Sequence, residues 1–169
     1  MNTNRIVLNE TSYFGPGSRS VIPEEVKRRN LKKAFIVTDN DLVKFGVVKQ
    51  VTDILEQAAI PYTTFAEVKQ NPTVTNVKAG VKAYAASAAD FIIAIGGGSP
   101  TDTAKAIGII TNNPEFSNVV SLEGVANTKN KSVPNYSFAN YGRNSSRSNY
   151  QLCDYRRREC QENGLCRPE

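Results

Sequence analysis

The sequence contains no histidine and only three cysteines. The absence of histidine excludes His-based acid/base catalysis and any His-containing metal site within these residues. No uninterrupted apolar run approaches the roughly 20 residues that a bilayer-spanning helix requires. The chain opens on the polar stretch 1–4 and lacks a charged-then-apolar leader. We therefore expect no membrane insertion, no secretion and a cytoplasmic location.

The overall composition indicates a globular chain. Hydrophobic residues make up 40% and charged residues 22% of the 169 residues, and the formal net charge is +5. These values exclude fibrous, collagenous and wholly disordered classes. The length suits one ordinary domain and is short for two.

The composition changes sharply near residue 134. Residues 1–134 hold all eleven lysines and no cysteine, whereas residues 135–169 hold six arginines, no lysine and no Val, Ile or Met. The second segment has too few apolar side chains to offset the entropy of ordering a core of its own. The sequence thus predicts an α/β domain at 1–134 and a disordered tail at 135–169.

The tail carries two patterns that could suggest function. Its cysteines follow C-x6-C-x5-C spacing, without a paired C-x-x-C and without a fourth ligand, which argues against structural zinc. The basic run 156–158, near two tyrosines, could suggest nucleic-acid binding, but a short basic run is usually a solvated face. We expect neither a metal site nor a nucleic-acid partner.

In residues 1–134, short apolar runs alternate with stretches of helical periodicity. This alternation predicts a Rossmann-like parallel sheet with helices on both faces. Ligands of such sheets bind outside the carboxyl ends of the strands, which directs attention to Asp39, Asn71 and the glycine run at 96–98. The predicted strands are 5–8, 33–38, 62–68 and 91–95, and the predicted helices are 21–29, 47–58, 74–88 and 100–111.

The run Gly96, Gly97, Gly98, Ser99 lies between the predicted strand 91–95 and a helix. Glycines let a backbone approach a ligand closely, and a helix N-terminus offers free N–H groups and partial positive charge, so the junction suits a phosphate or pyrophosphate. Neither the G-x-G-x-x-G nor the P-loop pattern matches. The alternative is a tight strand-to-helix turn.

Asp39 follows the predicted strand 33–38. A carboxylate there can accept hydrogen bonds from ribose 2′ and 3′ hydroxyls and would repel a 2′-phosphate, which favours NAD over NADP. The spacing alone favours a different role, the capping of a helix by Asp39, Asn40 or Asp41 ahead of Leu42. Asp102 could stabilise the N-terminus of the glycine-loop helix, and Lys105 could be a solvated side chain.

The joined motif from Gly96 to Lys105, G-G-G-S-P-T-D-T-A-K, resembles the G-G-G-S-x-x-D-x-x-K signature of the iron-dependent alcohol dehydrogenase family. Further runs resemble its lactaldehyde reductase branch, and the likeness covers essentially residues 4–134. These runs are 4–11, 37–39, 71–73, 106–116 and 121–124.

The resemblance implies the N-terminal, NAD-binding domain of a dehydroquinate synthase-like fold. In the family, a helical second domain holds Fe²⁺, or sometimes zinc, through one Asp and three His. Hydride passes between the nicotinamide and a small aldehyde or alcohol, and the enzyme is expected to be a homodimer. This sequence contains none of the metal ligands, so we expect the helical domain to be missing and the chain to be inactive.

The family's cofactor contacts fall on matching positions of this sequence. By resemblance, Gly97, Gly98 and Ser99, together with Gly96, would meet the pyrophosphate. Asp39 would bind the adenosine ribose, and Asn71 would lie on the adenosine side. Asp102 would face the nicotinamide end.

The tail departs from the family, which has a buried strand followed by P-T-T-A-G-T after the position of Pro134. Permitted codons for 135–144 are AAT TAT AGC TTT GCC AAC TAC GGC AGG AAC. Dropping the first base translates them as I-I-A-L-P-T-T-A-G, and family-like sequence continues in this frame to Glu169. We hypothesise that one extra base near the boundary between Pro134 and Asn135 shifted the reading frame.

Two alternatives remain. The chain could be a non-catalytic nucleotide-binding or interaction module. It could also be a fragment of another enzyme of the same fold, such as a glycerol dehydrogenase or dehydroquinate synthase. The matches at 71–73 and 112–114 disfavour this second alternative.

Overall fold

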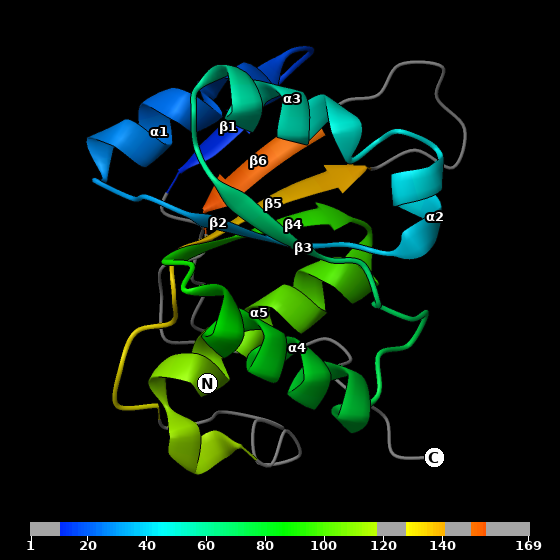
Figure 1. Ribbon diagram of the computed structural model, residues 1–169, viewed down its shortest axis with the longest axis vertical. Helices are drawn as coiled ribbons and strands as arrows, with labels where there is room; N and C mark the ends of the chain where they lie inside the picture. The colour runs from blue at the N-terminus through cyan, green and yellow to red at the C-terminus, as the bar shows by residue number, and fades with distance from the viewer. Residues whose placement is uncertain (1–10, 118–127, 141–149, 155–169) are drawn as a thin grey trace, which may run out of the picture.

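Strand β4 (Phe91–Gly96) lies inside the sheet because its side chains are apolar on both faces. The residues of this strand are all buried, as are those of its neighbour β2 (Ala34–Val37). In the computed structural model, which describes residues 11–117, 128–140 and 150–154, these strands belong to one six-stranded sheet (Figure 1). Continuous apolar strands of this kind are typical of a parallel sheet that is covered on both sides.

The sheet has the strand order β1-β6-β5-β4-β2-β3. Strands β2, β3, β4 and β5 run parallel, whereas β6 is antiparallel to both β5 and β1. The register places Ala34 opposite Phe91 and Val37 opposite Ala94. The remaining strands are β1 (Ser12–Phe14), β3 (Tyr62–Phe65), β5 (Asn135–Asn140) and β6 (Tyr150–Asp154).

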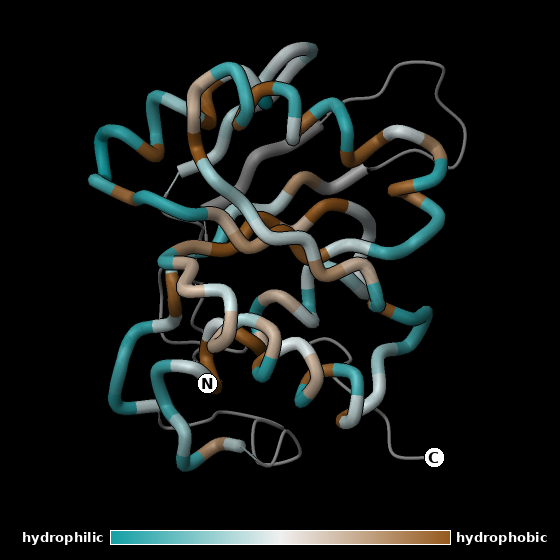
Figure 2. Tube along the Cα trace, viewed as in Figure 1, coloured by the Kyte–Doolittle hydropathy of each residue, from teal (hydrophilic) through white to brown (hydrophobic). Residues whose placement is uncertain are grey.

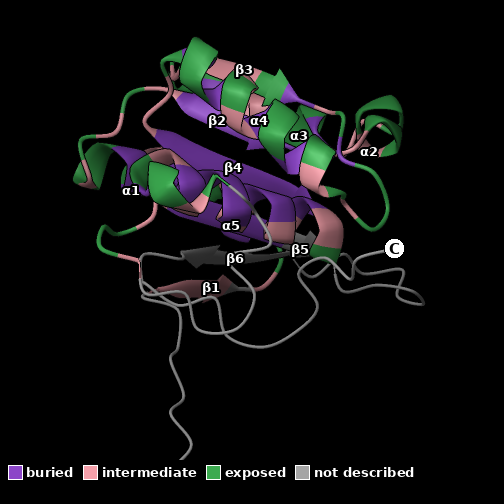
Figure 3. Ribbon diagram, turned by 90° about the horizontal axis from the view of Figure 1, so that it is seen from below, coloured by how far each residue is buried: buried purple, intermediate pink, exposed green. Residues whose placement is uncertain are grey.

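Helices cover both faces of the sheet, as Figures 1 and 3 show. The α-helices are α1 (Ile22–Arg28), α2 (Asn40–Lys44), α3 (Lys49–Gln57), α4 (Val74–Ser87) and α5 (Gly98–Asn112). Two short 3-10 helices are η1 (Ser18–Val21) and η2 (Pro114–Phe116). None of the helices in the described ranges is long and apolar enough to cross a membrane.

The core forms two layers because successive side chains of a strand point to opposite faces. Ala34 and Ile36 pack in the layer that contains residues of α1 and α3. Phe35 and Val37 pack in the opposite layer, with residues of α4 and α5. Figure 2 shows the hydrophobic residues concentrated in the central strands, with hydrophilic residues along the outer surfaces of the helices.

The structure confirms the α/β parallel sheet and most of its predicted elements. The predicted strands at 33–38, 62–68 and 91–95 correspond to β2, β3 and β4, and the four predicted helices correspond to α1, α3, α4 and α5. The predicted strand at 5–8 and the motif at 121–124 lie outside the described residues. Strand β1 was not predicted, and α2 was predicted only as a capped helix near Leu42, without bounds.

The prediction of a disordered tail does not hold for residues 135–140 and 150–154, and the rest of the tail lies outside the described residues. Disorder was expected from residue 135, but Asn135–Asn140 forms β5, and Tyr150–Asp154 pairs beside it as β6. Side chains 135–138 are buried, with Phe138 only 1% exposed. The physical reason is that an open edge of β4 offers unpaired backbone groups to whichever segment follows Pro134.

Candidate nucleotide site at the carboxyl ends of the strands

The topology places a cleft between the carboxyl ends of β2 and β4. From β2 the chain continues through α3 to β3 on one side, and from β4 it continues through α5 to β5 on the other side. The loops after the two strands therefore diverge, which is where open α/β sheets bind ligands. A cleft of about 920 Å³ opens there. It is lined by residues 39–42, Phe45, 67–70, Thr73, Thr75, Asn76, Ala79 and 97–100.

Gly96 makes the sharp turn from β4 into the cleft. Its φ of 139° lies in a region that residues with a side chain rarely adopt. A Cβ at this position would lie 2.8 Å from Pro100 Cγ and 2.9 Å from Leu42 Cδ1. The turn therefore requires glycine, and Gly96 brings α2 and α5 close together.

Gly97 and Gly98 present bare backbone at the start of α5. Gly97 is the N-cap residue, and no side chain caps the helix there. A Cβ at Gly97 would meet nothing within 4 Å, and one at Gly98 would meet only Asp102 Oδ2, at 3.9 Å. The first N–H groups of a helix lack intrahelical partners and carry partial positive charge. The glycines thus leave room for a ligand to approach an anion-accepting helix end.

Asp39 is the N-cap residue of α2. Its Oδ1 accepts a hydrogen bond from the Leu42 backbone N–H at 2.8 Å, which confirms the capping role that the spacing favoured. Just before it, the buried Thr38 hydroxyl donates to the carbonyl of Ile95 at 3.0 Å, tying the ends of β2 and β4 together. The half-buried Asp39 is thereby held on the cleft wall.

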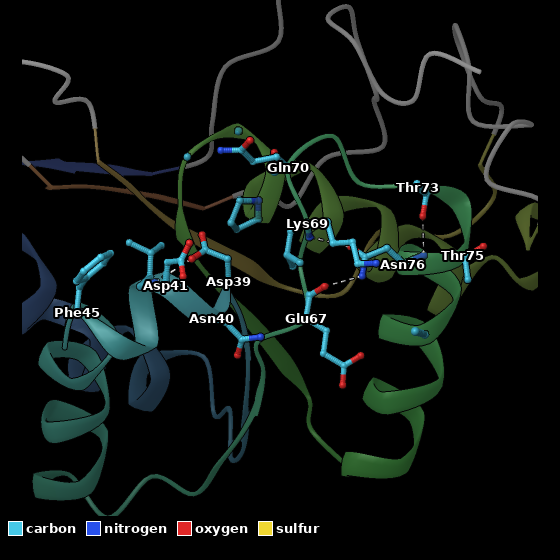
Figure 4. Close-up of a pocket in the computed structure, with 17 residues that line it drawn as sticks. Asp39, Asn40, Asp41, Phe45, Glu67, Lys69, Gln70, Thr73, Thr75 and Asn76 are labelled. Carbon is cyan, nitrogen blue, oxygen red and sulfur yellow. Dashed lines mark hydrogen bonds between the residues drawn. The ribbon is translucent and has the colours of Figure 1, made fainter. Parts of the chain in front are cut away.

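The opposite wall is held by Asn76, which the sequence reasoning missed. Its Nδ2 donates to the carbonyl of Glu67 at 2.8 Å, and its Oδ1 accepts from the Lys69 N–H at 3.4 Å (Figure 4). Thr73 caps α4, with its hydroxyl accepting from the Asn76 N–H at 3.3 Å. Thr73 directly before Val74 is an N-cap signal that could have pointed to this wall.

The structure brings part of the predicted site together. Asp39, Gly97, Gly98 and Ser99 line the cleft, and Gly96 makes the turn that precedes the last three without lining the cleft itself. Asn71 does not line it; with a φ of 54° it forms the left-handed turn before α4. Its predicted contact with the adenosine stays a prediction.

Asp102 lies on α5 beneath Gly98 and is not among the cleft-lining residues. Burial raises the pKa of its carboxyl, and the ammonium of Lys105, 3.8 Å away, opposes that rise. The predicted contact of Asp102 with the nicotinamide end stays a prediction.

The residues that the structure describes do not fit a metal centre. Within ranges 11–117, 128–140 and 150–154, no group of three or more His, Cys, Asp or Glu side chains could hold a metal ion. Cys160 and Cys166 lie outside these ranges.

The strand order, the diverging loops and the bare helix N-terminus define a doubly wound α/β domain. A protein-family model described as iron-containing alcohol dehydrogenase matches residues 9–137. The chain belongs to the iron-containing alcohol dehydrogenase family.

Two relatives illustrate the likeness in sequence. The chain is 53% identical over 131 residues to lactaldehyde reductase of Escherichia coli K12, covering 78% of this chain and 34% of the relative. It is 38% identical over 105 residues to 1,3-propanediol dehydrogenase of Citrobacter freundii, covering 61% of this chain and 27% of that one. The chain thus spans about a third of the length of these curated relatives.

Solved structures agree with this assignment. An alcohol dehydrogenase from Oenococcus oeni matches with a TM-score of 0.75 and 34% identity, over 82% of this chain and 36% of that one. A 1,3-propanediol oxidoreductase matches with a TM-score of 0.77 and 26% identity, over 91% of this chain and 43% of that one.

Proposed function

We propose that this chain is the NAD-binding part of an alcohol dehydrogenase related to lactaldehyde reductase, and that it binds NAD in the cleft between β2 and β4. The observation that carries the proposal is the convergence of Asp39 with Gly97, Gly98 and Ser99 at one cleft. The cleft combines an anion-accepting helix end with a carboxylate, the two features that a dinucleotide requires.

Two parts of the cofactor, the pyrophosphate and the adenosine ribose, would have partners in this arrangement. The backbone N–H groups at the start of α5 would receive the pyrophosphate, because a Cβ at Gly97 would occupy the space that the phosphate oxygens need. Asp39 uses Oδ1 to cap α2, and its second oxygen would accept a hydrogen bond from the ribose hydroxyls. When bound, NAD supplies the hydride acceptor or donor.

The reaction belongs to the whole protein of which this chain would be a part. Lactaldehyde reductase and 1,3-propanediol dehydrogenase, by their names, act on small aldehydes or diols, so we propose a small aldehyde or alcohol as the substrate class. In that whole protein iron would assist the reaction, and the enzyme would be a cytoplasmic homodimer. This chain by itself would bind NAD weakly and turn over no substrate.

Calorimetric titration of the full chain with NAD tests the binding. We expect heat of binding and a rise in melting temperature with NAD, since a ligand of the folded state stabilises it. NADP should bind at least tenfold more weakly because its 2′-phosphate meets the Asp39 carboxylate.

The matched variant is Asp39→Ser, which keeps a capping oxygen for Leu42 but removes the charge. It should fold normally and lose the preference for NAD over NADP. Equal affinity of the unaltered chain for NAD and NADP, or no binding of either, would contradict the proposal.

Turnover is tested separately. The chain is incubated with NADH, lactaldehyde and Fe²⁺, and absorbance at the nicotinamide band is followed. We expect a rate equal to that without protein. Iron-dependent oxidation of NADH by the chain alone would refute the proposed inactivity.

We also propose that residues 135–169 are translated from a shifted frame. Asn135 supports this: it is 1% exposed, and neither its Oδ1 nor its Nδ2 has a hydrogen-bond partner. A buried amide without partners costs about 1–3 kcal/mol. The neighbouring frame places isoleucine at this position and alanine at Ser137, which is also buried. Apolar residues there would suit the layer that contains Ile92.

Sequencing the coding DNA tests the frame. An open reading frame that continues far beyond residue 169 in the neighbouring phase, and encodes P-T-T-A-G directly after the strand, would support the proposal. A stop codon early in that phase would refute it.

A further inference from the structure

An aromatic side chain is exposed at the mouth of the cleft. Among the described residues, Phe45 and Val43 stand out as large apolar side chains that remain exposed, at 79% and 43%. Phe45 is the C-cap residue of α2 and lines the cleft, whereas Val43 does not. Covering the phenylalanine ring with a ligand in the cleft would gain the free energy that its exposure to water forgoes.

The geometry of α2 directs Phe45 toward the cleft. The Phe45 N–H donates to the carbonyl of Asp41 at 2.8 Å, so the helical turn is intact up to this residue. Residues three and four positions apart share a helix face, and Asp41 and Leu42 also line the cleft. Figure 4 shows Phe45 and Asp41 on the wall that α2 forms, across from Thr73 and Thr75.

Asp39 and Phe45 mark the two ends of this wall. A rise of about 1.5 Å per residue separates them by about 9 Å along the helix, a span that a ribose joined to a purine covers. If the carboxylate holds the ribose, the attached base can reach the ring. Aromatic side chains stack on bases because every base offers a π-face.

We propose that Phe45 is the base-stacking residue of this cleft and packs against the adenine of the bound nucleotide. The inference rests on the proposed NAD site and adds a residue to it that the sequence motifs do not include. Phe45 contributes the apolar face, while Asp39 and the α5 N-terminus contribute the polar contacts.

The experiment compares ADP, which carries the base, with inorganic pyrophosphate, which does not. Both are titrated calorimetrically into the full chain and into Phe45→Ala, Phe45→Leu and Val43→Ala. Phe45→Ala should weaken ADP binding about tenfold or more and leave pyrophosphate binding unchanged. Phe45→Leu, which keeps apolar bulk but loses the π-face, should fall between. Val43→Ala, on the same helix but outside the cleft, should bind like the unaltered chain.

Circular dichroism and melting temperatures establish whether each variant is folded. We expect all of them to fold, because the side chains of Phe45 and Val43 are exposed. If the unaltered chain binds neither ADP nor NAD, the proposed function fails and this inference fails with it. If it binds ADP, and Phe45→Ala binds ADP equally well, the stacking role alone is refuted. An equal loss of pyrophosphate binding would also refute it, because the effect would then be on the shape of the cleft.

Discussion

The turn at Gly96 permits a quantitative test of how the cleft is built. Replacing Gly96 by alanine forces a side chain into a backbone with a φ of 139° and into contact with two neighbours. The backbone strain costs about 1–3 kcal/mol. The Cβ would also lie 2.8 Å from Pro100 Cγ and 2.9 Å from Leu42 Cδ1. Overpacking of this kind costs about 1–3 kcal/mol more.

The expected loss in the free energy of unfolding is therefore about 2–6 kcal/mol, a large part of a typical domain's stability. Urea unfolding followed by circular dichroism measures it. Gly97→Ala is the matched control because a Cβ there meets nothing within 4 Å and its φ of −82° suits alanine. Its stability should change by less than about 1 kcal/mol, while its nucleotide affinity should fall.

Two results would refute this reasoning. If Gly96→Ala were as stable as the unaltered chain, the close approach of Leu42 and Pro100 would not limit the turn. If Gly97→Ala lost as much stability as Gly96→Ala, the open space above α5 would be filled, and the proposed pyrophosphate position would fail with it.

Three further predictions concern stability. Glu25→Gln should lower the free energy of unfolding by about 1.5–3 kcal/mol in urea titrations, because a neutral amide replaces the buried carboxylate that accepts from Arg29 at 3.1 Å and from Arg28 at 2.7 Å. Burial alone would raise the pKa of Glu25, but hydrogen bonds from Tyr13 and Arg28 hold it below the ordinary value. The carboxylate of Glu25 should therefore stabilise the fold above pH ~4.5, and this stabilisation should fade as the pH falls through the folded-state pKa. Glu25→Gln should not show this loss of stability in an acid titration. Burial raises the pKa of Tyr84 from 10.0 to about 12, so stability should fall as the pH rises from 10 toward 12, and Tyr84→Phe should flatten that decline. A pH profile that Tyr84→Phe leaves unchanged would contradict this assignment.

The sequence predicts best the elements that a local pattern of residues identifies. The apolar run of β4 and the turn residues around it identify a buried strand without knowledge of its partners. Helix α5 begins at Gly98, two residues before the predicted start, because Gly97 acts as the N-cap. Strand β1 was missed because its three residues, Ser12–Phe14, pair with β6, more than a hundred positions later in the chain. No local pattern carries that information.

The candidate site shows the same division. The glycine motif and Asp39 could be predicted because local sequence patterns mark the ends of strands and the starts of helices. Asn76 and Phe45 could not, since their places on the cleft walls depend on how α4 and α2 pack against the sheet. The capping role of Asp39 is compatible with its proposed ligand role. One carboxylate oxygen caps α2, and Asp39 also lines the cleft.

The fifth strand shows why a segment of foreign composition can still take its place in this sheet. Hydrogen bonds made by the residues before β5 hold the chain at the edge of β4. The side chain of Asn113 bonds to both backbone groups of Asn130, and the Val133 N–H donates to the carbonyl of Gly108 at 3.1 Å. The Ile92 N–H then donates to the carbonyl of Pro134 at 2.9 Å.

Once that first bond forms, pairing continues through backbone groups that every residue shares. The side chains of β5 determine how well the core packs. Phe138 and Tyr136 fill one layer, whereas Asn135 places an unpartnered amide in the other. The proposed shift of the reading frame would thus preserve the strand and degrade its packing. Asn135→Val, which removes the amide with little added volume, should therefore raise the free energy of unfolding by about 1–3 kcal/mol. An unchanged or lowered stability would show that the amide is satisfied and would remove the structural support for the shifted frame.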